Sequence, residues 1–200
     1  HFFKKEEDKR KLEELEKLLT TDNDPAWYKL GMGDSEEELA KLAKDLGLAE
    51  EIKGCIDLIK LFTDRLGLDE GISYRFSKWD PNNREKYMGT DEEWEHSQSV
   101  LKGILDDLKI DDGEAEGEAA FYGPKIDIQA KNVYGKEDTM ITIQLDCAIA
   151  EKFDMYYIDQ NGAKVRPYII HRTSLGCYER TMAWLIEKYA GKFPTWLCPE

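Results

Sequence analysis

The residues with the clearest chemical potential lie between His171 and Arg180, in the run His-Arg-Thr-Ser-Leu-Gly-Cys-Tyr-Glu-Arg. An apolar β-like run, Tyr168-Ile169-Ile170, ends at the His-Arg pair, and a helix with a second arginine follows. The imidazole of His171 can ligate a metal or a substrate, and the guanidinium of Arg180 can grip a phosphate. From spacing alone the simpler alternatives are stronger: a hydrogen-bonded structural histidine, and a surface arginine paired with Glu179 or Glu187.

Spacing predicts the helix that positions Arg180. Apolar residues recur three and four apart and give one stripe, formed by Leu175, Tyr178, Met182, Leu185, Ile186 and Tyr189. Arg180 falls opposite this stripe, so packing in the core does not explain it. Trp184 lies at the flank of the stripe or beyond it, and its substitution therefore tests whether the helix is buried on more than one side.

Several segments resemble, in order along the chain, the second half of the catalytic core of bacterial threonyl-tRNA synthetases, which are class II synthetases. The matching runs are 77–87, 91–94, 121–127, 142–146, 166–172 and 191–197. The combination of three motifs at matching distances is far more specific for the family than any one motif. The motifs are, in order, Tyr-Gly-Pro-Lys, Gln-Leu-Asp and His-Arg-x-x-Leu-Gly-x-x-Glu-Arg. The resemblance covers residues 51–200.

The resemblance implies a chemistry and a set of site residues. In this family ATP and threonine form an adenylate, threonine is transferred to tRNA, and zinc distinguishes threonine from valine. Arg180 matches the arginine that contacts the ATP phosphates, and His171 matches a zinc ligand. Tyr122 and Gln144 match pocket residues around threonine, and Lys125 belongs to the same substrate-facing motif.

The chain also departs from the family pattern. Residues 1–50 contain nothing similar to the family's first motif, which forms the dimer, or its second motif, which grips ATP. The triplet His1-Phe2-Phe3 resembles the one that carries a second histidine ligand, whereas the cysteine ligand belongs further upstream. Because His1 and His171 cannot close a tetrahedral site, we expect weak or absent zinc binding by this chain.

Composition limits the classes of protein. No apolar run approaches the roughly 20 residues that cross a membrane, and no signal peptide begins the chain, which predicts a soluble, cytoplasmic protein. A net charge of −14 argues against holding tRNA by bulk phosphate attraction. The four cysteines are scattered, and we expect reduced, mostly buried thiols.

The first part of the chain reads as helical. Lys4 to Leu19 form a charged helix, and Ser35 is the expected N-cap of a second helix that ends at Gly47. We therefore assign residues 1–48 to a helical hairpin or insertion, and residues 49–200 to a partial catalytic core. The chain stops about where the family's anticodon-binding domain begins, which predicts the edge of a fragment.

The predicted fold class is α+β, an antiparallel sheet flanked by helices, arranged as a meander capped by the final helix. Expected helices cover 49–67 and 91–108, Pro81-Asn82-Asn83 marks a loop, and expected strands cover 72–76, 126–133, 140–148, 155–158 and 164–170.

Two classes of function stay open from the sequence. One is part of a threonine–tRNA ligase, incomplete and inactive as an isolated chain, which needs its missing synthetase half. The other is a scaffold or interaction protein that keeps the synthetase-like sheet without catalysis. ATP binding without tRNA charging is a third possibility and rests on Arg180 alone. The oligomeric state is not predicted, since the dimer-forming motif is missing.

Overall fold

The computed structural model describes residues 36–68, 70–159 and 162–198, so the predicted helix over 4–19, the N-cap Ser35 and the triplet at His1 lie outside the described residues. The helices are α2 (Glu36–Arg65), η2 (Pro81–Lys86), α3 (Asp91–Asp107), α4 (Ile149–Lys152), α5 (Tyr178–Tyr189) and η3 (Thr195–Leu197). The strands are β1 (Ile72–Lys78), β2 (Asp112–Glu116), β3 (Lys125–Lys131), β4 (Glu137–Asp146), β5 (Tyr157–Ile158), β6 (Lys164–Val165) and β7 (Ile169–Arg172). None of the described helices is long and apolar enough to cross a lipid bilayer.

Helix α2 runs without a break through Gly47, so the predicted helix end at this glycine is wrong. A glycine inside a helix costs about 1 kcal/mol relative to alanine. Three isoleucines in the following turns, Ile52, Ile56 and Ile59, are each at most 1% exposed. Their burial stabilises the helix by more than the glycine costs.

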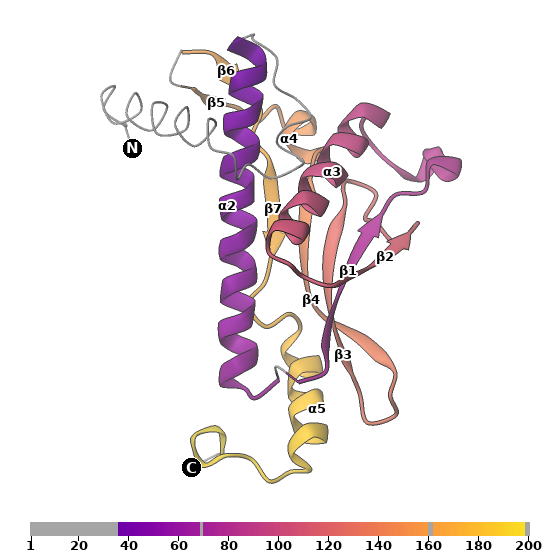
Figure 1. Ribbon diagram of the computed structural model, residues 1–200, viewed down its shortest axis with the longest axis vertical. Helices are drawn as coiled ribbons and strands as arrows, with labels where there is room; N and C mark the ends of the chain where they lie inside the picture. Colours follow the sequence, from indigo (N-terminus) through magenta and orange to yellow (C-terminus); the bar gives the residue numbers. More distant parts are fainter. Residues whose placement is uncertain (1–35, 69, 160–161, 199–200) are drawn as a thin grey trace.

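A five-stranded sheet of order β2-β1-β3-β4-β7 is the centre of the fold (Figure 1). Every pairing is antiparallel except that of β1 with β2, which is parallel. The predicted α+β class is confirmed, but the all-antiparallel meander is wrong at this edge. Helix α3 returns the chain from β1 so that β2 runs in the same direction. The sequence of β2, Asp-Gly-Glu-Ala-Glu, carries no apolar alternation that would predict a strand.

The strand predicted over 164–170 is two strands, β6 and β7, that belong to different sheets. Pro167 lies between them and has no backbone N–H to donate to a ladder. Strand β6 pairs with β5 in a small hairpin, whereas β7 pairs with β4. Strand β7 extends past the predicted end at Ile170 and includes His171 and Arg172, which places His171 on the sheet.

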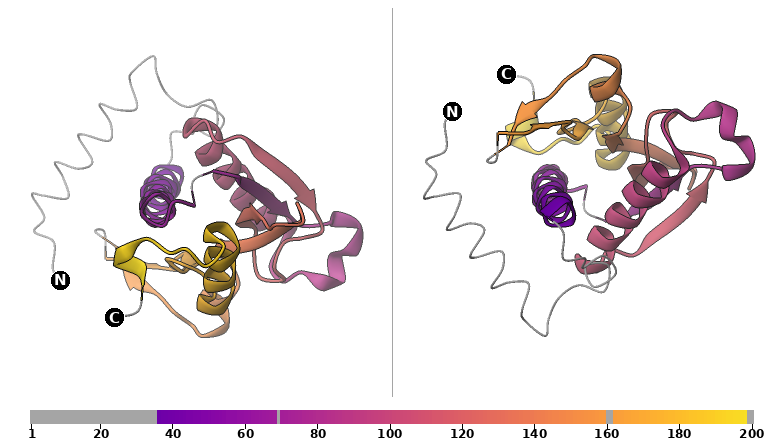
Figure 2. Two further views of the ribbon diagram at one scale, coloured as in Figure 1. Left: turned by 90° about the horizontal axis from the view of Figure 1, so that it is seen from below. Right: turned by 90° about the horizontal axis from the view of Figure 1, so that it is seen from above.

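The sheet has one apolar face, and α2 and α3 cover it. Alternate residues of β3 and β4 are buried there, among them Ile126, Ile128, Ile143 and Leu145, and they form one cluster with residues of α2, α3 and α5. Figure 2, which views α2 end-on, shows it flanked by α3 and α5. The opposite face of these strands is polar and carries the candidate site.

Only part of the apolar stripe predicted along α5 faces the core: Leu185 is buried and Tyr189 packs against the apolar cluster. Tyr178, Met182 and Ile186 are exposed, Tyr178 by 75%, whereas Thr181, Trp184 and Leu185 are buried. The Trp184 indole N–H donates to the carbonyl of Lys131 at 3.2 Å, and the Thr181 hydroxyl donates to the carbonyl of Leu175 at 2.7 Å. Because the polar atoms of both residues have backbone partners, Thr181 and Trp184 can be buried, and the packed face is turned from the one that hydrophobicity alone predicts. Leu175 precedes the helix, in the loop.

The segment after β1 is a short 3-10 helix rather than the predicted loop. Asp80 caps it by accepting a bond from the amide of Asn82 at 2.9 Å, and a proline opens it. The following residues build a second small core in which the rings of Trp79 and Trp94 stack at 5.5 Å and Tyr87 meets them edge-on.

None of the four cysteines, all of which the structure describes, is in a disulfide. Cys55 is buried, and Cys147 is partly exposed. The expectation of mostly buried thiols is wrong for Cys177 and Cys198, which are exposed.

Candidate functional site

A row of polar residues crosses the uncovered face of the sheet. In register, Ser77 of β1 lies opposite Lys125 of β3, Lys125 lies opposite Gln144 of β4, and Gln144 lies opposite His171 of β7. Directly opposite residues share a face of a sheet. The row therefore brings together three predicted site residues that are up to 46 positions apart in sequence, since 171 − 125 = 46.

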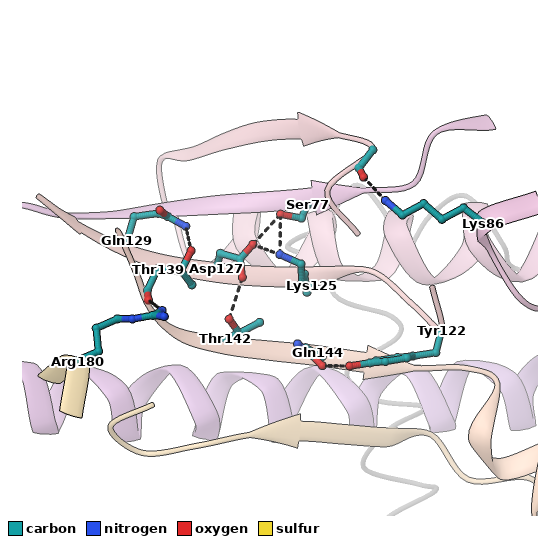
Figure 3. A network of polar contacts seen from close by, with 11 residues as sticks. Ser77, Lys86, Tyr122, Lys125, Asp127, Gln129, Thr139, Thr142, Gln144 and Arg180 are labelled. Carbon is teal, nitrogen blue, oxygen red and sulfur yellow. Dashed lines mark hydrogen bonds and ion pairs between the residues drawn. The ribbon is translucent and has the colours of Figure 1, made fainter. Parts of the chain in front are cut away.

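Tyr122 joins this row from the turn before β3. Its hydroxyl donates to Oε1 of Gln144 (Figure 3), and its ring lies 5.5 Å from that of His171. The next residue, Gly123, sits so close to β4 that a Cβ there would come 1.7 Å from the carbonyl oxygen of Leu145. Only glycine permits this approach. Burial, and then the negative charge of Asp146, raise the pKa of Tyr122 above its ordinary value.

Lys125 is held by a network of polar side chains on the same face of the sheet. Its ammonium forms an ion pair with Asp127 and lies 3.4 Å from the hydroxyl oxygen of Ser77. The Asp127 carboxylate also accepts from the hydroxyls of Ser77 and Thr142, each at 2.8 Å. Figure 3 shows Asp127 with these partners from three adjacent strands. Since the side chain of Lys125 is 18% exposed, it belongs to this network and is not a solvated lysine.

His171 is fixed by a buried carboxylate that the sequence did not single out. Nε2 of His171 lies 2.9 Å from Oδ2 of Asp146, whose side chain is fully buried. The other oxygen of Asp146 accepts from the amides of Ala148 and Ile149 at 2.9 and 2.8 Å. Asp146 closes the Gln-Leu-Asp motif. Two features of the sequence could have indicated its role. Asp146 falls on the polar side of the alternation along β4, and helix α4 begins three residues after it.

Arg180 enters the site from helix α5. It is exposed, and its guanidinium donates to the carbonyl of Thr139 near the start of β4. The helix begins after the tight loop 173–177, where Gly176 adopts φ +70° and a Cβ would come 1.9 Å from the carbonyl oxygen of Met140. This loop brings the first turn of α5 onto the rim of the sheet.

Gln144, His171 and Arg180 line one open cavity of about 690 Å³, together with residues of the loop 173–177. Tyr122 contacts the cavity residues through Gln144 and His171, and Lys125 lies next to Gln144 in the row. The cavity offers a guanidinium, an amide and an imidazole, and the phenol of Tyr122 holds the amide from beside it. Such a set can bind a phosphate at one end and a small polar molecule at the other.

A zinc site is not completed by the part of the chain that the structure describes. No three histidine, cysteine, aspartate or glutamate side chains in it come together in a way that could hold a metal ion. A structural or catalytic zinc takes at least three protein ligands. His171 alone among the predicted ligands lies in the described part, because His1 does not.

Residues 35–189 match the family described as the tRNA synthetase class II core domain (G, H, P, S and T). The chain belongs to this family. Proteins named threonine–tRNA ligase are similar to it: that of Clostridium botulinum (strain Eklund 17B / Type B) is 64% identical over 152 residues, which are 76% of this chain and 24% of that protein. That of Lacticaseibacillus paracasei is 50% identical over 150 residues, or 75% of this chain and 23% of that protein.

Among solved structures, the chain is similar to the RNA binding domain of threonyl-tRNA synthetase from Cryptosporidium parvum Iowa II. The TM-score is 0.65 at 33% identity, over 76% of this chain and 37% of that one. The resemblance to bacterial threonyl-tRNA synthetases is thereby confirmed. The chain spans about a quarter of the length of the curated relatives it matches.

Proposed function

We propose that this chain is the part of a threonine–tRNA ligase that supplies one side of the pocket for threonine and ATP. The reaction joins the threonine carboxylate to the α-phosphorus of ATP, releases pyrophosphate, and then passes threonine to tRNA. The observation that carries the proposal is that Gln144, His171 and Arg180 line one cavity, in a chain that is 64% identical over 152 residues to a threonine–tRNA ligase.

Arg180 is the proposed phosphate contact. Negative charge on the triphosphate grows as the carboxylate attacks, and a guanidinium stabilises it by position and charge. The bond to the carbonyl of Thr139 uses one amino group of a side chain with five donors. That bond therefore aims the guanidinium and leaves donors for phosphate oxygens.

Gln144 and Tyr122 are the proposed contacts to threonine. Because Tyr122 donates to Oε1 of Gln144, the amide nitrogen of Gln144 is turned to donate elsewhere. A site that hydrogen-bonds the threonine hydroxyl disfavours valine, which has a methyl group there and would leave buried polar groups unpaired.

Lys125 has a different proposed role. Its ion pair with Asp127 holds the positive charge of the ammonium on this face of the sheet, and Lys125 lies directly opposite Gln144. We assign it to the support of the pocket and to its positive potential in a chain with a net charge of −14.

Zinc is not assigned to the described residues, since they offer no complete set of ligands. His171 can contribute one ligand at most, and the remaining ligands would have to come from outside the described residues. Binding of tRNA is likewise proposed for the whole enzyme, because an acidic chain holds nucleic acid only through local patches.

Calorimetric titration with a non-hydrolysable threonyl-adenylate analogue tests the proposal, with and without added zinc. We expect binding of the threonyl compound and weaker binding of the valyl compound. Gln144→Ala should reduce the difference between them. The exposed Lys136→Ala, on the β3–β4 turn, is the control and should bind as the unaltered chain does.

If the chain is instead a non-catalytic scaffold, no binding is expected. A correctly folded chain that binds neither the analogue nor ATP, even with the missing part of the ligase added, would refute the proposal. Threonine-dependent exchange of pyrophosphate in the complemented mixture would instead establish the catalytic role.

A further inference from the structure

The connection between β4 and β7 carries a run of exposed apolar side chains, residues 153–158, which we call the apolar segment. Single apolar side chains are common on protein surfaces, whereas large contiguous apolar patches mark interaction sites. Five large apolar side chains of this segment are each between 42% and 69% exposed: Phe153, Met155, Tyr156, Tyr157 and Ile158.

Both faces of the hairpin formed by β5 and β6 are exposed. Neighbouring residues of a strand point to opposite faces. Tyr157 and Ile158, which make up β5, are 44% and 58% exposed, so neither face of this strand is buried by the rest of the described structure. The hairpin forms a separate two-stranded sheet beyond the end of the five-stranded one (Figure 1). A two-stranded hairpin is only marginally stable by itself, and a partner that enclosed it would remove this apolar surface from water.

Polar contacts nevertheless hold the apolar segment in one shape. Arg166, which follows β6, donates to the carbonyls of Ala150 and Met155 at 3.0 and 3.5 Å. These bonds tie the loop between α4 and β5 to the other strand of the hairpin. The ammonium of Lys164 lies 4.0 Å from the centroid of the Tyr156 ring and orients it. The surface is therefore formed before a partner binds, which lowers the entropic cost of binding.

The chemistry of the apolar segment fits an apolar protein surface. Its one charged residue, Asp154, pairs with Arg166 at 3.3 Å. RNA binding rests on cations that neutralise phosphates, and the five exposed side chains are uncharged. Burial of these side chains against another protein surface is favourable in proportion to the apolar area removed from water.

We propose that the apolar segment is the docking site for the part of a threonine–tRNA ligase that this chain lacks and that supplies the other side of the pocket. This rests on the proposed function, in which the chain supplies one side. The segment joins β4, which carries Gln144, to β7, which carries His171, so a partner bound to it lies beside the cavity. The chain spans about a quarter of the length of its curated relatives, so a protein of that length has ample further residues to enclose the hairpin.

Hydroxyl-radical footprinting of two proteins tests the proposal. One is this chain, and the other is a hybrid in which the chain replaces the matching part of the Clostridium botulinum ligase. We expect the oxidation rates of residues 153–158 to fall several-fold in the hybrid. Tyr87 and Trp94, which are 5% and 3% exposed in the second small core, should react slowly in both proteins and show that the chain is folded.

Phe153→Ala provides a second measurement in the same two proteins. The melting temperature of the isolated chain should not change, because the side chain is 69% exposed there. The melting temperature of the hybrid should fall by a few degrees, since the ring is then buried against the partner. Tyr134→Ala is the matched control: this aromatic side chain is 90% exposed in the turn between β3 and β4, at the other end of β4, and its loss should change neither protein.

Unchanged oxidation of residues 153–158 in the hybrid, or an equal effect of Phe153→Ala on the two proteins, would overturn the proposal. Protection of the segment in the isolated chain by a higher chain concentration would assign it to a second copy, and protection by added tRNA would assign it to RNA. Either result would also overturn the proposal.

Threonine-dependent exchange of pyrophosphate by the hybrid separates this inference from the proposed function. If residues 153–158 are protected but the hybrid does not exchange pyrophosphate, the docking site stands and the proposed function fails. If the hybrid exchanges pyrophosphate while these residues stay reactive, the proposed function stands and the docking site is refuted.

Discussion

The two faces of the central sheet are built from alternate residues of the same strands, yet they are held together differently. On the helix-covered face, Ile126 and Ile143 are at most 1% exposed and pack against other apolar side chains. On the other face, Asp127 and Gln129 are also buried, but each has a specific hydrogen-bond partner.

The difference means that one face of a strand contributes most of the stability, whereas the other carries the polar groups of the candidate site. Apolar packing is non-directional and tolerates changes of shape at moderate cost, whereas a polar network fixes each group by direction and distance. The polar face can therefore present oriented donors to a ligand because the apolar face has already fixed the backbone. Substitutions in the apolar cluster should consequently cost the most stability, and substitutions of exposed site residues should chiefly change the affinity for a ligand.

Trp184→Ala should give the largest loss of stability. The side chain is 8% exposed and lies in the apolar cluster, so we expect the free energy of unfolding to fall by about 3–5 kcal/mol. Urea denaturation measures it. Tyr178→Ala on the same helix is the control and should change stability by about 0.5 kcal/mol or less. Equal losses in the two variants would mean that α5 does not pack as described.

Asp127→Asn should give an intermediate loss. It removes the charge that pairs with Lys125, while the shape and one acceptor oxygen stay, and we expect a loss of about 1–3 kcal/mol. Denaturation at several salt concentrations measures it. Glu114→Gln breaks an exposed pair with Lys78 at 2.5 Å and should cost at most about 1 kcal/mol. If Asp127→Asn cost no more than this control, the network would not support the polar face.

Arg180→Ala should leave stability almost unchanged, within about 0.5 kcal/mol, because the residue is exposed. The affinity for ATP or the adenylate analogue should fall about tenfold to a hundredfold, as expected for a charged hydrogen bond. Thermal melting and calorimetry check the two results. Lys188→Ala, on the same helix, should change neither by much. A large loss of melting temperature in Arg180→Ala would make the residue structural.

Tyr122→Phe should change the pH dependence of stability, and this change should be visible only in alkali. Burial raises the pKa of Tyr122 in the folded chain, so the folded state keeps the phenolic proton at pH values where the unfolded state has lost it. Its stabilising contribution is complete below the ordinary pKa of about 10 and is lost as the pH rises through the folded value. Unfolding curves across this range should fall less steeply for Tyr122→Phe. If stability fell equally steeply with pH in both proteins, the pKa of Tyr122 would not be raised by burial.

Much of the site was predictable because its signals are local. Alternation along β3 and β4 indicated strands with one apolar face, and the motifs around Tyr122, Gln144, His171 and Arg180 indicated the family. The role of Asp146 escaped this reading, because its partners come from β7 and from the backbone of α4. No pattern within one segment reports a contact between segments.

The sequence by itself determined the α+β class, the helices α3 and α5 and the types of residue that the cavity contains. Only the tertiary structure decided that α2 continues through Gly47, that β2 joins the sheet in parallel, and that Trp184 faces the core. The physical reason is that periodicity shows which residues share a side of an element. Which side is buried, and in which register strands meet, depends on the free energy of packing against distant segments.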